Sequence, residues 1–283
     1  MGCNMENTNE SEILKKHNKK LLLRIADLES ANAHLESQLS MASKLKYHLM
    51  PNSYPAFPDV PDIDIFADSI EIKQIGGDYY DFFRIDADHI GIVIADIFDG
   101  GSAAALYMVA FKTYLTSQIS LDNEVAQRVE TANDLLCWEN ADDLCLSAWF
   151  GVYEISSGIL KCVNAGHEKS IILRDSKAYN CEMETVSYLL GVASGMKYDS
   201  FEIKLEAGDK LLLYTDGVTG AAIGDEGTYG RDRLVNAYES TGDMGAEETV
   251  AYLEKDFSKY TRDMGIKEDV TFLCVKRQGG ERL

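Results

Sequence analysis

Residues 75–96 read IGGDYYDFFRIDADHIGIVIAD and hold two apolar runs of strand length, at 79–85 and 90–95. Only residues 86–89 separate the two runs. A parallel pair of strands needs a crossover of about a dozen or more residues, so the two runs predict an antiparallel hairpin. This stretch therefore favours an antiparallel sheet as the basis of the fold.

The chain after residue 61 continues this pattern of strands that follow one another directly. Further runs of strand length occur at 63–67, 148–155, 159–164, 170–173, 211–215 and 270–275. Helical patterns occur at about 102–119, 123–140, 231–238 and 245–263. Because strands and helices alternate in blocks rather than singly, we expect antiparallel sheets with helices outside, not a doubly wound parallel sheet. The sequence predicts an α+β domain over residues 62–278.

A heptad pattern precedes this domain. One seam position is occupied by Leu14, Leu21, Leu28, Leu35, Ala42 and Leu49, and the other by Asn18, Ile25, Asn32, Leu39 and Lys46. This spacing is typical of a coiled coil, and asparagine at the seam position of Asn18 and Asn32 favours an in-register parallel dimer. We expect a flexible segment at 1–10, a coiled-coil dimerisation and regulatory helix at 11–50, and a parallel homodimer through residues 14–49. The alternative is a long amphipathic helix packed on its own domain.

All four prolines of the chain fall at positions 51, 55, 58 and 61. Such spacing is incompatible with a helix, because proline lacks the backbone N–H and restricts the residue before it. Residues 51–61 are therefore predicted to be a connector between the helix and the domain.

The composition excludes several classes of protein. A net charge of −20 argues against nucleic-acid binding, which depends on Lys and Arg. No run approaches the roughly 18 consecutive apolar residues of a membrane span, and no signal-peptide pattern is visible. The cysteines form no Cys-x-x-Cys pair and no cysteine-phosphatase loop, which fits reduced core residues. We expect a cytoplasmic protein that binds neither nucleic acid nor membrane.

Four carboxylates lie where apolar strand runs begin or end: Asp78, Asp96, Asp216 and Glu268. A carboxylate at a strand end is fixed by the sheet and faces its accessible edge. Several such groups are able to converge on hard cations such as magnesium or manganese. The pattern therefore indicates a metal-dependent hydrolase.

Five short motifs follow one another along the chain. They are Gly76-Gly-Asp-Tyr-Tyr-Asp81, Ala95-Asp96 leading to Gly101-Ser-Ala-Ala-Ala-Leu106, Val163-Asn-Ala-Gly-His167, Leu211-Leu-Leu-Tyr-Thr-Asp-Gly-Val-Thr219 and Glu268-Asp-Val-Thr271. In this order they resemble the SpoIIE and RsbU branch of the metal-dependent PPM serine/threonine phosphatases. The resemblance covers residues 41–276 and implies an α-β-β-α sandwich, in which two antiparallel sheets are flanked by helices.

The resemblance also implies roles for the carboxylates. Asp78, Asp96 and Asp216 would be the catalytic residues, and Asp78, Asp96, Ile97 through its carbonyl, Asp216 and Glu268 would be the metal ligands. Two divalent cations, manganese or magnesium, would activate a bridging water for attack on phosphoserine or phosphothreonine. The implied substrate is a phosphorylated regulator protein of the anti-sigma-factor antagonist type, in bacterial partner-switching signalling with an upstream sensor or activator.

The chain departs from the family pattern at two places. Glu268 stands where the family usually has Asp, and its extra methylene would weaken one site or favour manganese over magnesium. After Asp96, relatives usually carry Val-Ser-Gly-Lys-Gly, whereas this chain reads Ile97-Phe-Asp-Gly-Gly101. Asp99 is then either an extra ligand or a surface acid, and Gly100 removes a lysine. These departures motivate a second hypothesis, a degenerate phosphatase that acts as a phosphoregulator-binding adaptor.

Four further residues have open roles at this point. His167 is more simply a hydrogen-bonded turn residue than a ligand or general acid. Asp81 either orients the metal ligands or caps a turn. Asp269 would replace Glu268 as ligand if the register slipped by one residue. Lys73 is a candidate for the cation that contacts phosphate. A purely structural coiled-coil scaffold would leave the strand-end carboxylates unexplained.

Overall fold

The computed structural model describes residues 3–72, 75–98, 101–117, 124–140, 143–181, 187–223, 227–262 and 265–279. The chain divides into two compact units, residues 1–45 and 46–283. Helix α1 (Cys3–Leu49) makes up the first unit, and its last turn belongs to the second. Within the described residues, no helix combines the length and the apolar composition that crossing a bilayer requires.

Helix α1 leaves its heptad leucines in contact with solvent. Leu14, Leu21, Leu28 and Leu35 are between 49% and 59% exposed. A seam of leucines gains stability only when another surface covers it. The predicted dimer would supply that surface, and it stays a prediction. The predicted domain boundaries and the flexible segment at 1–10 also stay predictions; helix α1 begins within that segment, at Cys3.

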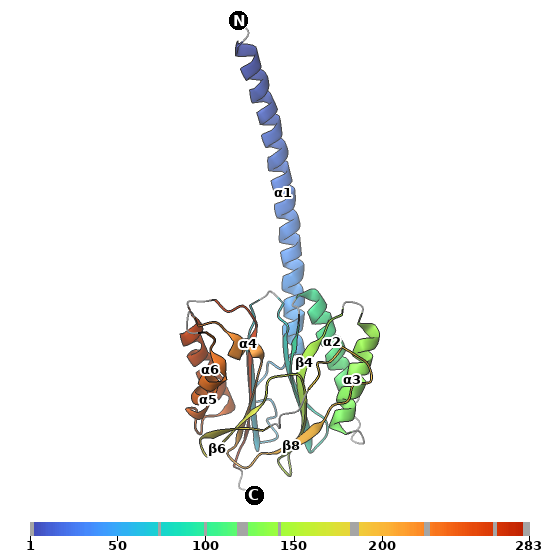
Figure 1. Ribbon diagram of the computed structural model, residues 1–283, viewed down its shortest axis with the longest axis vertical. Coiled ribbons are helices and arrows are strands. Elements are labelled where there is room, and N and C mark those ends of the chain that lie inside the picture. Colours follow the sequence, from blue (N-terminus) through green and yellow to red (C-terminus); the bar gives the residue numbers. More distant parts are fainter. Residues whose placement is uncertain are drawn as a thin grey trace. The chain divides into compact units, whose positions relative to one another are not determined.

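The second unit is built on two five-stranded antiparallel sheets (Figure 1). In spatial order, the first sheet contains β1 (Ile63–Ile70), β10 (Val270–Arg277), β9 (Lys210–Tyr214), β6 (Ile171–Arg174) and β7 (Lys177–Asn180). The second contains β2 (Asp78–Arg84), β3 (His89–Ile97), β4 (Leu146–Glu154), β5 (Ile159–Ala165) and β8 (Ser200–Lys204). The hairpin predicted over residues 75–96 is the β2–β3 pair.

Helices cover the outer face of each sheet. Helices α5 (Gly230–Glu239) and α6 (Ala246–Thr261) pack on the first sheet, and α2 (Ser102–Ser117) and α3 (Val125–Glu139) pair with each other on the second (Figure 1). A short helix, α4 (Asp216–Gly220), follows β9 directly. The α-β-β-α sandwich expected from the resemblance is confirmed.

Strand β10 shows how the sequence builds two cores at once. Side chains alternate across a strand, so Phe272 and Cys274 join the core under α5 and α6, whereas Leu273 and Val275 join the core between the sheets. All four side chains are fully buried. A continuous apolar run is therefore required here, because both faces of this central strand are covered.

Candidate metal centre

Asp78 and Asp96 face each other on neighbouring strands. Asp78 begins β2, and the antiparallel register pairs it with Asp96 near the end of β3. Asp78 is only 2% exposed. Opposed residues in an antiparallel pair lie close enough for their side chains to interact. The sheet therefore brings two of the predicted catalytic carboxylates together.

The Asp78 carboxylate connects the two sheets. Its Oδ2 atom accepts hydrogen bonds from Thr271 Oγ1 of β10 at 2.6 Å and from Thr215 Oγ1, just after β9, at 2.8 Å. Burial, followed by the nearby Asp96, raises the pKa of Asp78 well above its usual range, and the two threonines act in the opposite direction. A nearby cation would remove this penalty on the charged form.

Asp96 lies at the centre of the acidic cluster. Burial raises its pKa to about 6, and the charges of Asp216, Asp269 and Glu268 add to the shift. The carboxylates of the cluster, with Asp78 included, come from four places in the chain: the start of β2, the end of β3, the start of α4 and the residues just before β10. The fold therefore brings Asp216 and Glu268 within electrostatic range of Asp96.

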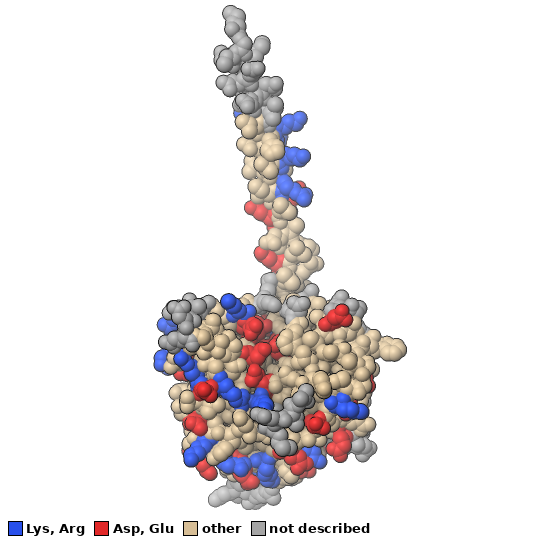
Figure 2. Space-filling model, in the orientation of Figure 1, with Lys and Arg blue, Asp and Glu red and all other residues tan. Residues whose placement is uncertain are grey.

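Asp216 and Glu268 lie on the exposed side of the cluster. Asp216 is the first residue of α4, and Gly217 allows α4 to begin against the loop before β10. A Cβ atom at Gly217 would overlap the carbonyl oxygen of Asp269 and lie 3.4 Å from Glu268 Cβ. Figure 2 shows acidic side chains in a band down the middle of one face of the domain, where α4 lies in Figure 1.

The donor set fits hard divalent cations. Carboxylate and carbonyl oxygens are the preferred ligands of magnesium and manganese, and a cation would offset the repulsion between these acids. However, no three of the described His, Cys, Asp and Glu side chains converge closely enough to hold a metal ion as they stand. The individual assignments of Asp78, Asp96, Ile97, Asp216 and Glu268 therefore stay predictions.

Asp269 acts on the turn before Asp78. Its Oδ2 atom accepts a hydrogen bond from the backbone N–H of Gly77 at 2.7 Å, and its Oδ1 atom accepts one from Ile72 at 2.8 Å. The carboxylate therefore fixes the backbone that leads into β2. Glu268, by contrast, is exposed.

Gly77 is the tightest point of this turn. A Cβ atom on it would lie 2.5 Å from the carbonyl oxygen of Ile97 and 3.1 Å from Asp96 Oδ1. Gly77 and Ile97 are also joined by a backbone hydrogen bond of 3.2 Å. The close approach explains the glycine, and it keeps the Ile97 carbonyl beside Asp96.

We expect Gly77→Ala to lower the free energy of unfolding by about 1–3 kcal/mol, because the added methyl forces the Ile97 carbonyl and Asp96 apart. The same shift should weaken the stabilisation that added manganese gives. Thermal unfolding with and without manganese measures both effects. Gly279→Ala is the control, since a methyl there meets only Ala207 Cβ at 3.8 Å. Equal unfolding curves for the two variants would contradict the argument.

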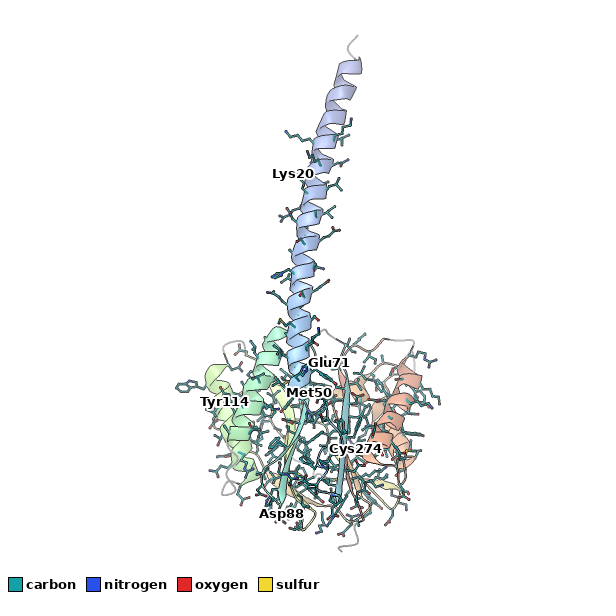
Figure 3. All side chains as sticks on the ribbon, turned by 180° about the vertical axis from the view of Figure 1, so that it is seen from behind. Lys20, Met50, Glu71, Asp88, Tyr114 and Cys274 are labelled. Atoms are coloured by element: carbon teal, nitrogen blue, oxygen red, sulfur yellow. The ribbon has the colours of Figure 1, made fainter. Side chains whose placement is uncertain are left out.

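Two lysines join the end of α1 to the metal-site strand. Lys46 is 2% exposed, and its Nζ atom donates to the Gly76 carbonyl at 2.9 Å and to Glu71 Oε1 at 2.5 Å. Figure 3 shows Glu71 near Met50, the residue that follows this helix. The sequence pattern assigns Lys46 to the coiled-coil seam and not to a contact with the domain.

Lys112 of α2 forms the second of these connections. Its Nζ atom donates to the Leu49 carbonyl at 2.7 Å and pairs with Asp81 Oδ2 at 2.7 Å. The same Asp81 oxygen accepts a hydrogen bond from the Tyr79 hydroxyl at 2.9 Å. Of the two roles considered for Asp81, this arrangement fits a carboxylate that orients the strand carrying Asp78. Lys73, Asp99 and Gly100 lie outside the described residues.

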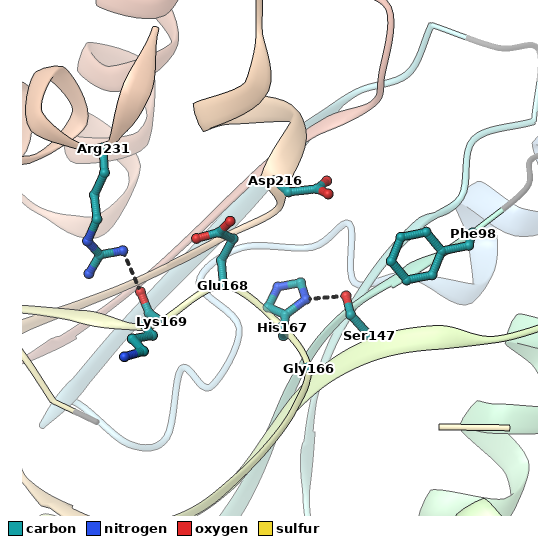
Figure 4. Close-up of a pocket in the computed structure, with 8 residues that line it drawn as sticks. All are labelled: Phe98, Ser147, Gly166, His167, Glu168, Lys169, Asp216 and Arg231. Carbon is teal, nitrogen blue, oxygen red and sulfur yellow. Dashed lines mark hydrogen bonds between the residues drawn. The ribbon is translucent and has the colours of Figure 1, made fainter. Parts of the chain in front are cut away.

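A pocket of about 350 Å³ lies beside Asp216 (Figure 4). Its walls are Phe98, Ser147, Gly166, His167, Glu168, Lys169, Asp216 and Arg231. The His167 ring is buried, and its Nδ1 atom shares a hydrogen bond of 2.8 Å with Ser147 Oγ. Burial lowers the pKa of His167 to about 4, so the ring is neutral at pH 7. The simpler interpretation of His167, a hydrogen-bonded residue, agrees with this geometry.

Comparison with known proteins identifies the family. The profile of stage II sporulation protein E (SpoIIE) matches residues 86–278, which include four of the five motifs in full. The chain belongs to the SpoIIE family. The resemblance inferred from the motifs is thereby confirmed, and the family assignment covers most of the sandwich domain.

Relatives and solved structures agree with this SpoIIE assignment. Phosphoserine phosphatase RsbU of Bacillus subtilis is 25% identical over 252 residues, covering 89% of this chain and 73% of RsbU. The structure of the RsbU and RsbW domains of Rv1364c from Mycobacterium tuberculosis is 25% identical, with a TM-score of 0.64, over 77% of this chain and 61% of that one. The PP2C domain of SiaA from Pseudomonas aeruginosa shares the fold, with a TM-score of 0.75 at 17% identity over 87% of this chain and 98% of that one. The chain spans 41%, 73% and 45% of the length of three of the curated relatives that it matches.

Proposed function

We propose that this protein is a metal-dependent phosphoserine/phosphothreonine protein phosphatase of bacterial partner-switching signalling. The carrying observation is the acidic surroundings of Asp96, which pairs with Asp78 across β2 and β3 and lies within electrostatic range of Asp216, Asp269 and Glu268. Membership of the SpoIIE family and the name of the relative RsbU, a phosphoserine phosphatase, support the same hydrolase class.

Two divalent cations, manganese or magnesium, would be held by Asp78, Asp96, Asp216, Glu268 and the Ile97 carbonyl. When bound, they would lower the pKa of a water molecule and neutralise phosphate oxygens, so that water attacks phosphorus without a covalent enzyme intermediate. The chain itself contributes the positioning. Thr215 and Thr271 fix the Asp78 carboxylate, and Asp269 fixes the turn before it.

The substrate we propose is a phosphorylated regulator of the anti-sigma-factor antagonist type. The similarity to the phosphoserine phosphatase RsbU and to the structure of the RsbU and RsbW domains of Rv1364c supports this class of partner. We also assign the protein to the cytoplasm. Among the described residues, Cys137, Cys145 and Cys274 form no disulfide, which is compatible with a reducing compartment.

The adaptor hypothesis remains the second candidate. It is favoured by Glu268 in the position of a shorter ligand and by the lack of a closed three-carboxylate site among the described residues. The test is turnover of a phosphoserine peptide with added manganese, compared with Asp216→Asn. A metal-dependent rate that this variant lacks supports the phosphatase, and no rate above the variant supports the adaptor.

The helix would act as a dimerising and regulatory arm. We expect removal of residues 1–43 to convert a dimer into a monomer, because the exposed seam leucines are lost while the sandwich domain is kept. Light scattering measures the mass, and deletion of residues 1–40 should also change turnover if an upstream sensor or activator works through the arm. An unchanged subunit number after truncation would contradict the coiled-coil dimer.

A further inference from the structure

The pocket beside Asp216 extends away from the proposed metal ligands. Asp216 is the only proposed ligand among its walls; the others come from the segment that follows β5, from β4, from the residue after β3 and from the start of α5. A phosphoserine bound at Asp216 brings its phosphoryl oxygens and the adjacent side chains of the substrate with it. This pocket is placed to receive one of these groups. None of the roles derived above uses Lys169 or Arg231.

Arg231 uses its donors on the protein itself. Its Nη1 atom donates to the Lys169 carbonyl at 3.1 Å and to the Tyr214 hydroxyl, and its Nη2 atom donates to Asn180 Oδ1 at 2.5 Å. The guanidinium also lies 5.8 Å from the centre of the Tyr214 ring. Arg231 is therefore a residue that holds the Lys169 backbone in place (Figure 4).

Glu168 is tied into the same network. Its Oε2 atom accepts a hydrogen bond of 3.3 Å from the Tyr214 hydroxyl, the group that Arg231 contacts. The Tyr214 hydroxyl therefore links the negative charge of Glu168 to the positive charge of Arg231. His167 is neutral and bound to Ser147, so it adds no charge to the pocket wall.

Lys169 is the cation that remains for a ligand. Its side chain is half-buried at the pocket wall. In the described part of the chain, its ammonium group has no hydrogen bond or ion pair within the usual distances. A half-buried ammonium is screened less by water than one on an open surface, so it attracts an anion more strongly.

An anionic substrate needs such a group because the protein is strongly acidic. The chain carries a net charge of −20, and Asp216 lies in the pocket itself. A phosphate dianion or a carboxylate that approaches this face meets repulsion unless cations offset it. Cations bound at Asp216 would offset part of it there, and Lys169 would act at the other end of the pocket.

We propose that this pocket is a subsite for an anionic group of the phosphoprotein, with Lys169 as the binding cation and Arg231 as the residue that positions it. The proposal rests on the proposed phosphatase function and adds a recognition element to it. The anion is either a phosphoryl oxygen of the phosphoserine or the carboxylate of an acidic residue beside it. Both belong to one substrate and require the same cation.

Steady-state kinetics in manganese distinguish the two sources of the anion. The substrates are p-nitrophenyl phosphate and two phosphoserine peptides that differ only in an Asp or Ala next to the phosphoserine. We expect Lys169→Ala to raise KM about tenfold with kcat within about twofold, and Lys169→Arg to restore it. A rise for all three substrates identifies the phosphoryl group, and a rise for the Asp peptide alone identifies the carboxylate.

The controls separate this subsite from a structural role. Lys177→Ala removes an exposed lysine of β7 outside the pocket and should leave KM unchanged. Arg231→Gln should raise KM in the same direction, and adding Lys169→Ala should raise it little further, because both act on one contact. Unchanged KM for all three substrates in Lys169→Ala would overturn the proposal.

Peptide binding keeps the test independent of turnover. Fluorescence anisotropy with the labelled phosphoserine peptides measures Kd for the full chain in manganese. If the protein turns over no substrate but Lys169→Ala still weakens peptide binding about tenfold relative to Lys177→Ala, the subsite stands and the phosphatase proposal fails. If turnover is normal and neither Kd nor KM responds to Lys169→Ala, the subsite alone is wrong.

Discussion

Asp216→Asn is expected to lower kcat for a phosphoserine peptide by at least about 100-fold in saturating manganese. The amide keeps the size of the side chain but removes the charge that would hold a cation. Asp216 is exposed at the first position of α4, so its side chain contributes little to packing. Asparagine is also tolerated in the first turn of a helix. The loss should therefore be chemical and not a consequence of unfolding.

Asp199→Asn is the matched control for this variant. Asp199 is an exposed aspartate before β8, outside the acidic cluster, and its replacement should leave kcat unchanged. Circular dichroism and the melting temperature of both variants should match those of the native chain in the absence of metal. If Asp216→Asn keeps a manganese-dependent rate within a few-fold of native, Asp216 is not a ligand and the two-cation proposal is wrong at that residue.

The central strands were predictable because burial on both faces leaves a continuous apolar run, as in β10 and β9. The structure adds β7, β8 and α4, which the sequence patterns did not indicate. Strand β7 is an edge strand whose side chains are mostly exposed, so no apolar alternation marks it. Strand β8 is the edge of the other sheet, and α4 has only five residues, fewer than periodicity can reveal.

The candidate site likewise contains residues that the sequence predicted and residues that it did not. The positions of Asp78 and Asp96 at strand ends were predictable, because the end of an apolar run is visible in the local sequence. Thr271 and Lys46 were missed because their contacts with the site join residues far apart in the sequence, Thr271 with Asp78 and Lys46 with Gly76. A charged residue at a heptad seam position was the one available signal for Lys46, since lysine there costs a coiled coil stability.

Lys46 belongs to two structures at once. In the heptad it occupies a seam position, and in the domain its ammonium group is buried against Gly76 and Glu71. Gly76 precedes Gly77, whose N–H is held by Asp269 and whose carbonyl binds the Ile97 N–H. A rotation or shift of the last helical turn would therefore pull directly on the turn that begins β2. This contact gives the proposed regulatory arm a physical route to Asp78.

Lys46→Met should uncouple that route. We expect the free energy of unfolding to fall by about 2 kcal/mol, because two charge-assisted hydrogen bonds are lost and Glu71 keeps only partial access to water. Manganese should also bind about 10-fold more weakly, as when a residue that orients metal ligands is removed. Denaturant unfolding gives the first quantity, and the manganese concentration for half-maximal turnover gives the second.

Two further variants decide what the Lys46 contact does. Lys46→Arg keeps the charge and should recover most of the stability, whereas Glu71→Gln tests the ion pair without touching the bond to Gly76. If the Gly76 bond carries the coupling, Glu71→Gln lowers stability but leaves the manganese requirement near native, and Lys46→Met changes both. A Lys46→Met protein that is less stable yet needs no more manganese would mean that Lys46 only anchors the helix, and the regulatory arm would then have to act on the metal centre through Lys112 and Asp81 instead.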